Sequence, residues 1–313
     1  MNAAYITETL VPLLLDMFYM FIGVQLFYTA YRVMKQTDHP TRFGTAIFWA
    51  LLGIIFAFGN MMPPVFSGLF LVIMGLLTLF KQVKMGRLET TTEEEQAAHA
   101  DRIGNGIFVP AIILAITAVV IAQFTPFGGQ VGIGVAAVVS LLVAMGIFRA
   151  SPKEALDESD RMVQQVGTTG ILPQLLAALG VLFTTAGVGD VIADLISGVV
   201  PQGNRLIGVI AYVFGMVIFT MIMGNAFAAF TVITAGIGLP FVIAQGADPA
   251  IAGALAMTAG FCGTLMTPMA ANFNALPAAL LEMKNPNGVI KVQTPMALIL
   301  IVIHIALMYF WAF

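Results

Sequence analysis

The fold is decided by Gly224-Asn225-Ala226-Phe227-Ala228-Ala229-Phe230-Thr231 and by Gly263-Thr264-Leu265-Met266-Thr267-Pro268-Met269-Ala270-Ala271-Asn272-Phe273-Asn274. These segments, the first break (224–231) and the second break (263–274), interrupt an apolar stretch, 206–281, whose one charged residue is Asp248. Inside a bilayer, backbone that leaves a helix must be surrounded by protein or by a water-filled cavity. Transporters use such broken helices to build sites for small molecules. The two breaks are therefore the first places to look for function.

Composition fixes the class of protein. The chain is 59% hydrophobic and 9% charged, with a mean hydropathy of +0.97, whereas soluble domains carry about 25% charged residues. Several apolar runs approach or exceed the ~20 residues that cross a membrane. The sequence predicts an all-α polytopic membrane protein with about 8–10 transmembrane helices, some interrupted or re-entrant. The clearest runs are 11–31, 45–62, 107–124, 131–148, 206–223 and 295–313.

Several function classes are excluded by what the sequence lacks. It has no His-Glu-x-x-His zinc motif, no Gly-x-Ser-x-Gly nucleophile elbow and no phosphate-binding loop. Its single cysteine, Cys262, cannot form an internal disulfide, and the net charge of −3 is too small to suggest a nucleic-acid partner. We expect neither an enzyme nor a bound metal or cofactor.

Basic residues predict the orientation and the two halves of the chain. Most of the 13 lysines and arginines fall after 11–31, in 81–105 and in 149–165, while the segments before residue 11, at 60–64 and at 125–130 carry none. Basic loops face the cytoplasm, so we expect the N-terminus outside and these loops inside. The segment 149–165 also shows the signals of a helix start, Ser151, Pro152 and Glu154. We divide the chain into halves 1–165 and 166–313.

Residues 170–200 allow two interpretations. The apolar segment 170–185 is only about 24 Å long as a helix, and Gly187 and an amphipathic segment follow it. A re-entrant hairpin is slightly favoured over one span followed by a surface helix. Asp190 and Asp194 lie one turn apart on that amphipathic segment, where they mark its polar face or help to bind a coupling cation.

Two ionisable residues lie within apolar runs, where such groups are functional candidates. Asp16 lies in the first run and would carry a coupling proton or hold a structural, interfacial position. His304 lies in the middle of the last run, where a hydrogen bond between helices is the favoured role.

The two breaks also allow a functional and a structural interpretation. For Gly224-Asn225 an interrupted helix is slightly favoured over an ordinary turn between two spans at the membrane surface. For the second break function is favoured over packing, because unpaired polar groups are costly in hydrocarbon. Glycines at 224 and 263 permit close approach of backbone, and Pro268 stops a helix from resuming. The side chains of this candidate site are Asn225, Thr231, Thr264, Thr267, Asn272 and Asn274.

The sequence resembles a known bacterial membrane family at 223–240, 267–274 (Thr-Pro-Met-Ala-Ala-Asn-Phe-Asn) and 284–288 (Lys-Asn-Pro-Asn-Gly). That family is described as one subunit of a 5-oxoproline (pyroglutamate) transporter, and the resemblance covers nearly the whole chain. It implies an inner-membrane secondary transporter that works with a second, smaller membrane subunit. A more distant similarity, to the superfamily of divalent-anion symporters, implies re-entrant hairpins and Na⁺ or H⁺ as the coupling ion.

By this resemblance, Asn225 and Thr231 lie at an interrupted helix, and Thr264, Thr267, Asn272 and Asn274 at a hairpin tip. The superfamily's Ser-Asn-Thr triplet is missing from the first half, so the partner subunit would complete the site. A 5-oxoproline site needs donors for a carboxylate and both a donor and an acceptor for a lactam, which asparagines and a helix N-terminus supply. The expected function is transport of this small carboxylate near the membrane midplane. The alternative is a non-transporting accessory subunit that stabilises a partner permease.

Overall fold

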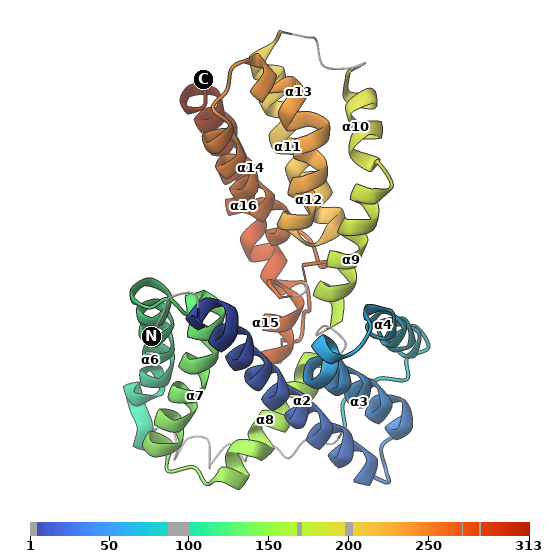
Figure 1. Cartoon of the computed structure of the whole chain (residues 1–313), viewed down its shortest axis with the longest axis vertical. Helices are drawn as coiled ribbons and strands as arrows, with labels where there is room; N and C mark the ends of the chain where they lie inside the picture. Colours follow the sequence, from blue (N-terminus) through green and yellow to red (C-terminus); the bar gives the residue numbers. More distant parts are fainter. Residues whose placement is uncertain (1–4, 87–100, 168–170, 198–202, 271, 282) are drawn as a thin grey trace. The chain divides into compact units, whose positions relative to one another are not determined.

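The structure is a computed structural model that describes residues 5–86, 101–167, 171–197, 203–270, 272–281 and 283–313, and it is helical with no strand in these ranges (Figure 1). The chain divides into two compact units, Met1–Gly167 and Thr168–Phe313. The halves expected from the sequence were 1–165 and 166–313. The all-α polytopic fold class is confirmed.

The first unit contains two antiparallel helix pairs and an amphipathic helix. In the α2–α3 pair the backbones approach closely, because a Cβ on Gly23 would lie only 2.7 Å from Ala57 Cβ. In the α6–α7 pair the Ser140 hydroxyl donates to the Pro110 carbonyl over 2.8 Å. The described elements are η1 (Ile6–Leu10), α2 (Val11–Lys35), α3 (Arg42–Phe58), η2 (Gly59–Met61), α4 (Pro64–Leu79), η3 (Gly104–Phe108), α6 (Val109–Phe124), α7 (Gly128–Phe148) and α8 (Pro152–Val166).

Helix α8 begins where the sequence indicated. Ser151 is its N-cap, and a reciprocal pair of hydrogen bonds joins Ser151 and Glu154 in a capping box. One face of α8 packs on the end of α2, where Arg32 forms ion pairs with Asp157 and, over 3.4 Å, with Asp160. Asp160 is 2% exposed, so this amphipathic helix brings a carboxylate into the protein interior.

The second unit is a bundle of helices joined by hydrogen bonds between neighbours. Tyr212 on α11 hydrogen-bonds to Thr234 over 2.8 Å, and His304 on α16 reaches Thr258 on α14 over 2.9 Å, the interhelical bond expected for this histidine. The elements are α9 (Leu172–Thr185), α10 (Val188–Ser197), α11 (Arg205–Met223), α12 (Ala226–Ile233), η5 (Thr234–Gly238), α13 (Leu239–Phe241), η6 (Ile243–Gln245), α14 (Pro249–Leu265), α15 (Ala275–Leu280) and α16 (Gly288–Trp311).

Seven described helices are long and apolar enough to cross a membrane, and an eighth span results if α9 and α10 count as one. The segments Ala178–Thr185 and Val188–Leu195 are bent by 65° at their junction, beside Gly187 in the left-handed region with φ of 71°. This angle is far from the reversal of a hairpin. The favoured hairpin interpretation of 170–200 is therefore replaced by a bent helix, whose second arm packs on η5 where Gly189 meets Gly236.

The core of the second unit is a close contact between α11 and α14. A Cβ on Gly263 would collide with the Val217 carbonyl oxygen, and one on Gly260 would lie 2.9 Å from Met216 Cε. The neighbouring Val213, Met216 and Ala259 are fully buried. Small residues allow such close backbone packing in membrane helices, where dispersion replaces the hydrophobic effect between helices.

We predict that Gly263→Ala destabilises the protein by about 1–3 kcal/mol, because the added methyl group meets backbone that cannot turn aside. Gly253→Ala, in the same helix, is the matched control, since its Cβ would lie 3.6 Å from the nearest atom, Phe230 Cζ. Thermal unfolding of the purified protein in detergent measures both. Equal melting temperatures for the two variants would contradict the packing argument.

We also predict that Asp160 makes stability depend on pH in one direction. Burial raises the pKa of its carboxyl, and contacts that include Arg32 and Gln164 offset only part of that shift. A folded-state pKa above the unfolded value of about 3.9 means that the folded protein holds this proton more tightly. The contribution of Asp160 to stability is therefore greatest below pH ~4 and falls as pH rises through the folded-state pKa.

The measurement is the unfolding free energy of wild type minus that of Asp160→Asn across a pH series. This difference should decrease from pH ~4 upward and then level off, because only the wild type carries the titrating group. A difference that grows with pH would show that the ion pair with Arg32 outweighs burial.

Candidate functional site

The first break is a tight turn between two antiparallel helices. Helix α11 ends at Met223, Gly224 takes the left-handed conformation with φ of 66°, and α12 begins at Ala226. The Asn225 side-chain oxygen caps α12 by accepting from Phe227 N at 2.9 Å and from Ala228 N at 3.3 Å. The structure therefore shows a turn between two helices at Gly224-Asn225 and not an interrupted helix. A left-handed glycine followed by a capping residue reverses the chain here.

A pocket of ≈440 Å³ opens at this turn, between the end of α9 and the start of α12. Its volume lies in the range of about 300–1,000 Å³ that is usual for small-molecule sites. The structure brings Asn225 and Thr231 together in this first-break pocket, as the sequence predicted for a substrate site. Its lining adds Thr184 and Thr185 to these two, with Gly180, Val181, Phe227 and Ala228.

The hydrogen bonds in the first-break pocket determine which groups a ligand would meet. The hydroxyls of Thr184, Thr185 and Thr231 each donate to a carbonyl of their own helix, over 2.9–3.0 Å. Their oxygens can still accept. The Asn225 Nδ2 group donates no hydrogen bond within the described residues, so it is available to donate to a ligand. A carboxylate could gain further donors if Asn225 released the N–H groups that it caps.

The second break is held together by its own polar side chains. The Asn274 amide group donates to the carbonyls of Thr264 and Thr267, each over 2.7 Å. The Thr267 hydroxyl donates to Met221 O over 2.8 Å and accepts from Met269 N at 3.2 Å, and the Thr264 hydroxyl donates to Phe261 O over 2.7 Å. All three side chains are at most 3% exposed. In this structure they therefore close the loop after α14.

The two breaks lie beside each other. The bond from Thr267 to Met221 joins the second break to the end of α11, next to the first. The Phe261 ring also contacts a ring from each break, Phe227 at 6.1 Å and Phe273 at 6.2 Å between centroids. Since 19 residues of α-helix extend about 28 Å, α11 is long enough to cross a membrane. The paired breaks lie beside the end of this helix. The site near the membrane midplane that the sequence suggests stays a prediction.

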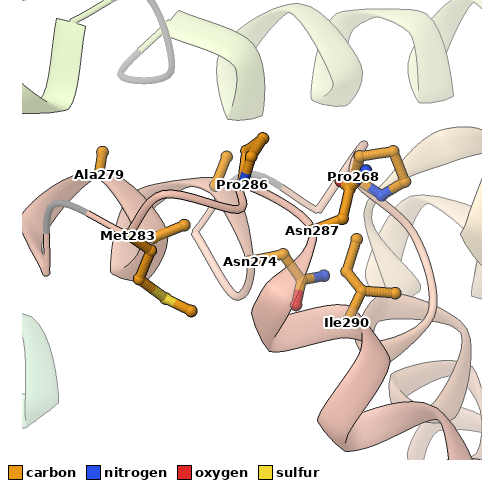
Figure 2. Close-up of a pocket in the computed structure, with 9 residues that line it drawn as sticks. Pro268, Asn274, Ala279, Met283, Pro286, Asn287 and Ile290 are labelled. Carbon is orange, nitrogen blue, oxygen red and sulfur yellow. The ribbon is translucent and has the colours of Figure 1, made fainter.

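A second pocket, of ≈250 Å³, lies on the other side of the second break, between α15 and the start of α16 (Figure 2). Among the predicted site residues it is lined by Pro268 and Asn274. Thr264, Thr267 and Asn272 do not line it, and Asn272 is exposed in the preceding turn. The lining of this second-break pocket continues with Met283, Pro286, Asn287, Ile290 and three alanines of α15.

The acidic candidates do not join either pocket. Asp16 belongs to the first unit, where it accepts a hydrogen bond from Asn60 Nδ2 over 2.6 Å. Asp190 and Asp194 are exposed on α10. Within the described ranges, no three His, Cys, Asp or Glu side chains come together as a metal site. An ion-coupling role for the three aspartates stays a prediction.

Sequence reasoning missed several pocket residues. Thr184 and Thr185 precede the Gly187 turn, and this pair of hydroxyls beside a helix break could have indicated a binding site from the sequence. Ile290 and Met283 belong to an ordinary apolar pattern. They reach the second-break pocket because the chain turns at Asn285–Gly288. The sequence indicates a turn there, but not which pocket the flanking residues line.

We predict that Thr267→Val lowers stability by about 1–3 kcal/mol, because it leaves the Met221 carbonyl and the Met269 N–H without their partner. Thr267→Ser keeps the hydroxyl and should stay close to wild type. Thr294→Val is the control, since that hydroxyl bonds only to its own helix, at Ile290 O. Melting temperatures in detergent measure the three variants. A Val variant as stable as the control would show that the bond does not hold the loop.

The chain was compared with known proteins. No curated protein and no solved structure matched it. The family described as "Protein of unknown function (DUF979)" matches residues 16–313, which contain both breaks and both pockets. The chain therefore belongs to this family.

Proposed function

We propose that this multi-pass membrane protein is a subunit of an ion-coupled secondary transporter for a small organic acid, with 5-oxoproline as the substrate. The observation that carries the proposal is the pairing of the two breaks, with a pocket beside each. Polar turns that meet among apolar helices are how transporters expose backbone and side-chain groups to a solute. The substrate itself rests on the sequence resemblance.

The first-break pocket supports binding of a monoanion. Its lining residues carry no charge, and 206–281 contains no lysine or arginine. A carboxylate would be held there by the Asn225 amide and by N–H groups at the start of α12, without a buried cation. A dicarboxylate or a phosphate would need more positive charge than this pocket offers.

The remaining parts of the proposal come from the sequence. The resemblance implies the bacterial inner membrane, and the basic loops favour an N-terminus on the outside. A second, smaller membrane subunit accompanies it, and Na⁺ or H⁺ drives transport. The competing function is an accessory subunit that does not bind substrate. It predicts transport that is indifferent to the residues of both breaks.

The test is uptake of labelled 5-oxoproline by cells that lack their own carrier and express both subunits. Asn225→Asp keeps an oxygen that caps α12 and so preserves the turn, but it places a negative charge where the carboxylate would bind. We expect uptake to fall by about tenfold or more, as the loss of one charge-assisted hydrogen bond implies. Asn204→Asp is the matched control, because Asn204 is the N-cap of α11 and does not line the pocket.

Each other outcome has a defined meaning. Unchanged uptake by Asn225→Asp, at equal expression, would remove the first-break pocket from the transport pathway. Uptake by the partner subunit alone would support the accessory function. If cells with both subunits take up no 5-oxoproline, the substrate assignment is wrong.

A further inference from the structure

The second-break pocket contains a buried hydrogen-bond acceptor that has no donor. Asn274 is 1% exposed, and its Oδ1 atom finds no hydrogen-bond partner among the described residues. A buried polar atom in this state costs about 1–3 kcal/mol. Such atoms are rare in folded proteins and require an explanation.

The orientation of this amide is fixed by its surroundings. Both 2.7 Å contacts of the nitrogen are with carbonyl oxygens, of Thr264 and Thr267, which can only accept. Exchanging the nitrogen and oxygen of the amide would place an acceptor against two acceptors. The Oδ1 atom must therefore be the one that points away from the loop. Figure 2 shows the amide among the residues that line the pocket, between Met283 and Ile290 in that view.

The rest of the pocket restricts what could satisfy this acceptor. Its other lining is mainly apolar and includes Pro268, Pro286 and Ile290, and it carries no charged residue. The volume of ≈250 Å³ suits a small ring rather than a long chain. A fitting ligand therefore presents one hydrogen-bond donor, an N–H or an O–H group, beside a compact apolar body.

We propose that the second-break pocket binds the N–H edge of a small lactam ring, with Asn274 Oδ1 as the acceptor. This inference deepens the proposed function, on which it rests. It assigns recognition of the lactam N–H to Asn274, in the pocket between α15 and α16. An ester ring of the same shape lacks the N–H and would leave Oδ1 unpaired, so the site selects lactam over lactone.

The decisive experiment compares two neutral probes, 2-pyrrolidinone and γ-butyrolactone, which differ in that a ring oxygen replaces the N–H. Binding to the purified full-length protein in detergent is measured by ligand-observed NMR. We expect the lactam to bind about tenfold more tightly or better, because the lactone forfeits one hydrogen bond and leaves its acceptor desolvated. Neither probe carries a carboxylate, so the result does not depend on the transport of 5-oxoproline.

Two variants locate the binding site without disturbing Asn274, whose amide holds the loop. Ile290→Phe fills the pocket and should abolish the lactam preference. Val292→Phe is the matched control, because Val292 is 81% exposed and does not line the pocket. Both variants are checked for unchanged melting temperature.

Three results would overturn the inference. Equal binding of lactam and lactone would mean that a water molecule or nothing satisfies Oδ1. A preference that survives Ile290→Phe would place lactam recognition elsewhere, and no binding of either probe would rule out the pocket as a site. If the lactam preference is found while 5-oxoproline uptake fails, the inference stands and the proposed substrate does not.

Discussion

The organisation of the second unit depends on one constraint, that the ends of apolar helices must find partners for their backbone groups without water. Asn225 supplies an acceptor for two N–H groups at the start of α12. Asn274 supplies donors for two carbonyls, one in the last turn of α14 and one just beyond it. Thr267 joins these ends by bonding to Met221 O. The polar side chains of the breaks thus first stabilise the fold. A ligand can bind only to the hydrogen-bonding groups that are not already engaged in these bonds.

The groups left over differ between the two pockets. At the first break the remaining side-chain donor is an amide nitrogen, and at the second the remaining acceptor is an amide oxygen. These are the complementary halves of an asparagine's hydrogen-bonding capacity. The structural use of the two asparagines is therefore compatible with a chemical use, because each side chain has one end engaged and one end open.

Much of the fold was accessible from sequence because composition and helix-start signals are local. The polytopic class, the helix start at Ser151 and the interhelical role of His304 follow from such signals. The path of the chain after a helix ends is not local. A Gly-Asn pair fits a turn or an interruption, and contacts such as Gly208 with Phe241 decide between them. Asn225 and Thr231 lie six residues apart, and the structure places both in one pocket. The hydroxyls of Thr264 and Thr267 donate to backbone carbonyls, and for the same reason the sequence alone could not show this.

The glycine contact between α11 and α14 has a mechanical consequence. Ordinary helix pairs are separated by a layer of side chains that change rotamer and so absorb small displacements. At Gly260 and Gly263 that layer is missing, and the backbone of one helix lies against the other. The two helices therefore cannot shift much relative to each other and should move as one rigid body. Any movement that changes access to the paired breaks must then involve the neighbouring elements, the bent α9–α10 helix and the short α15.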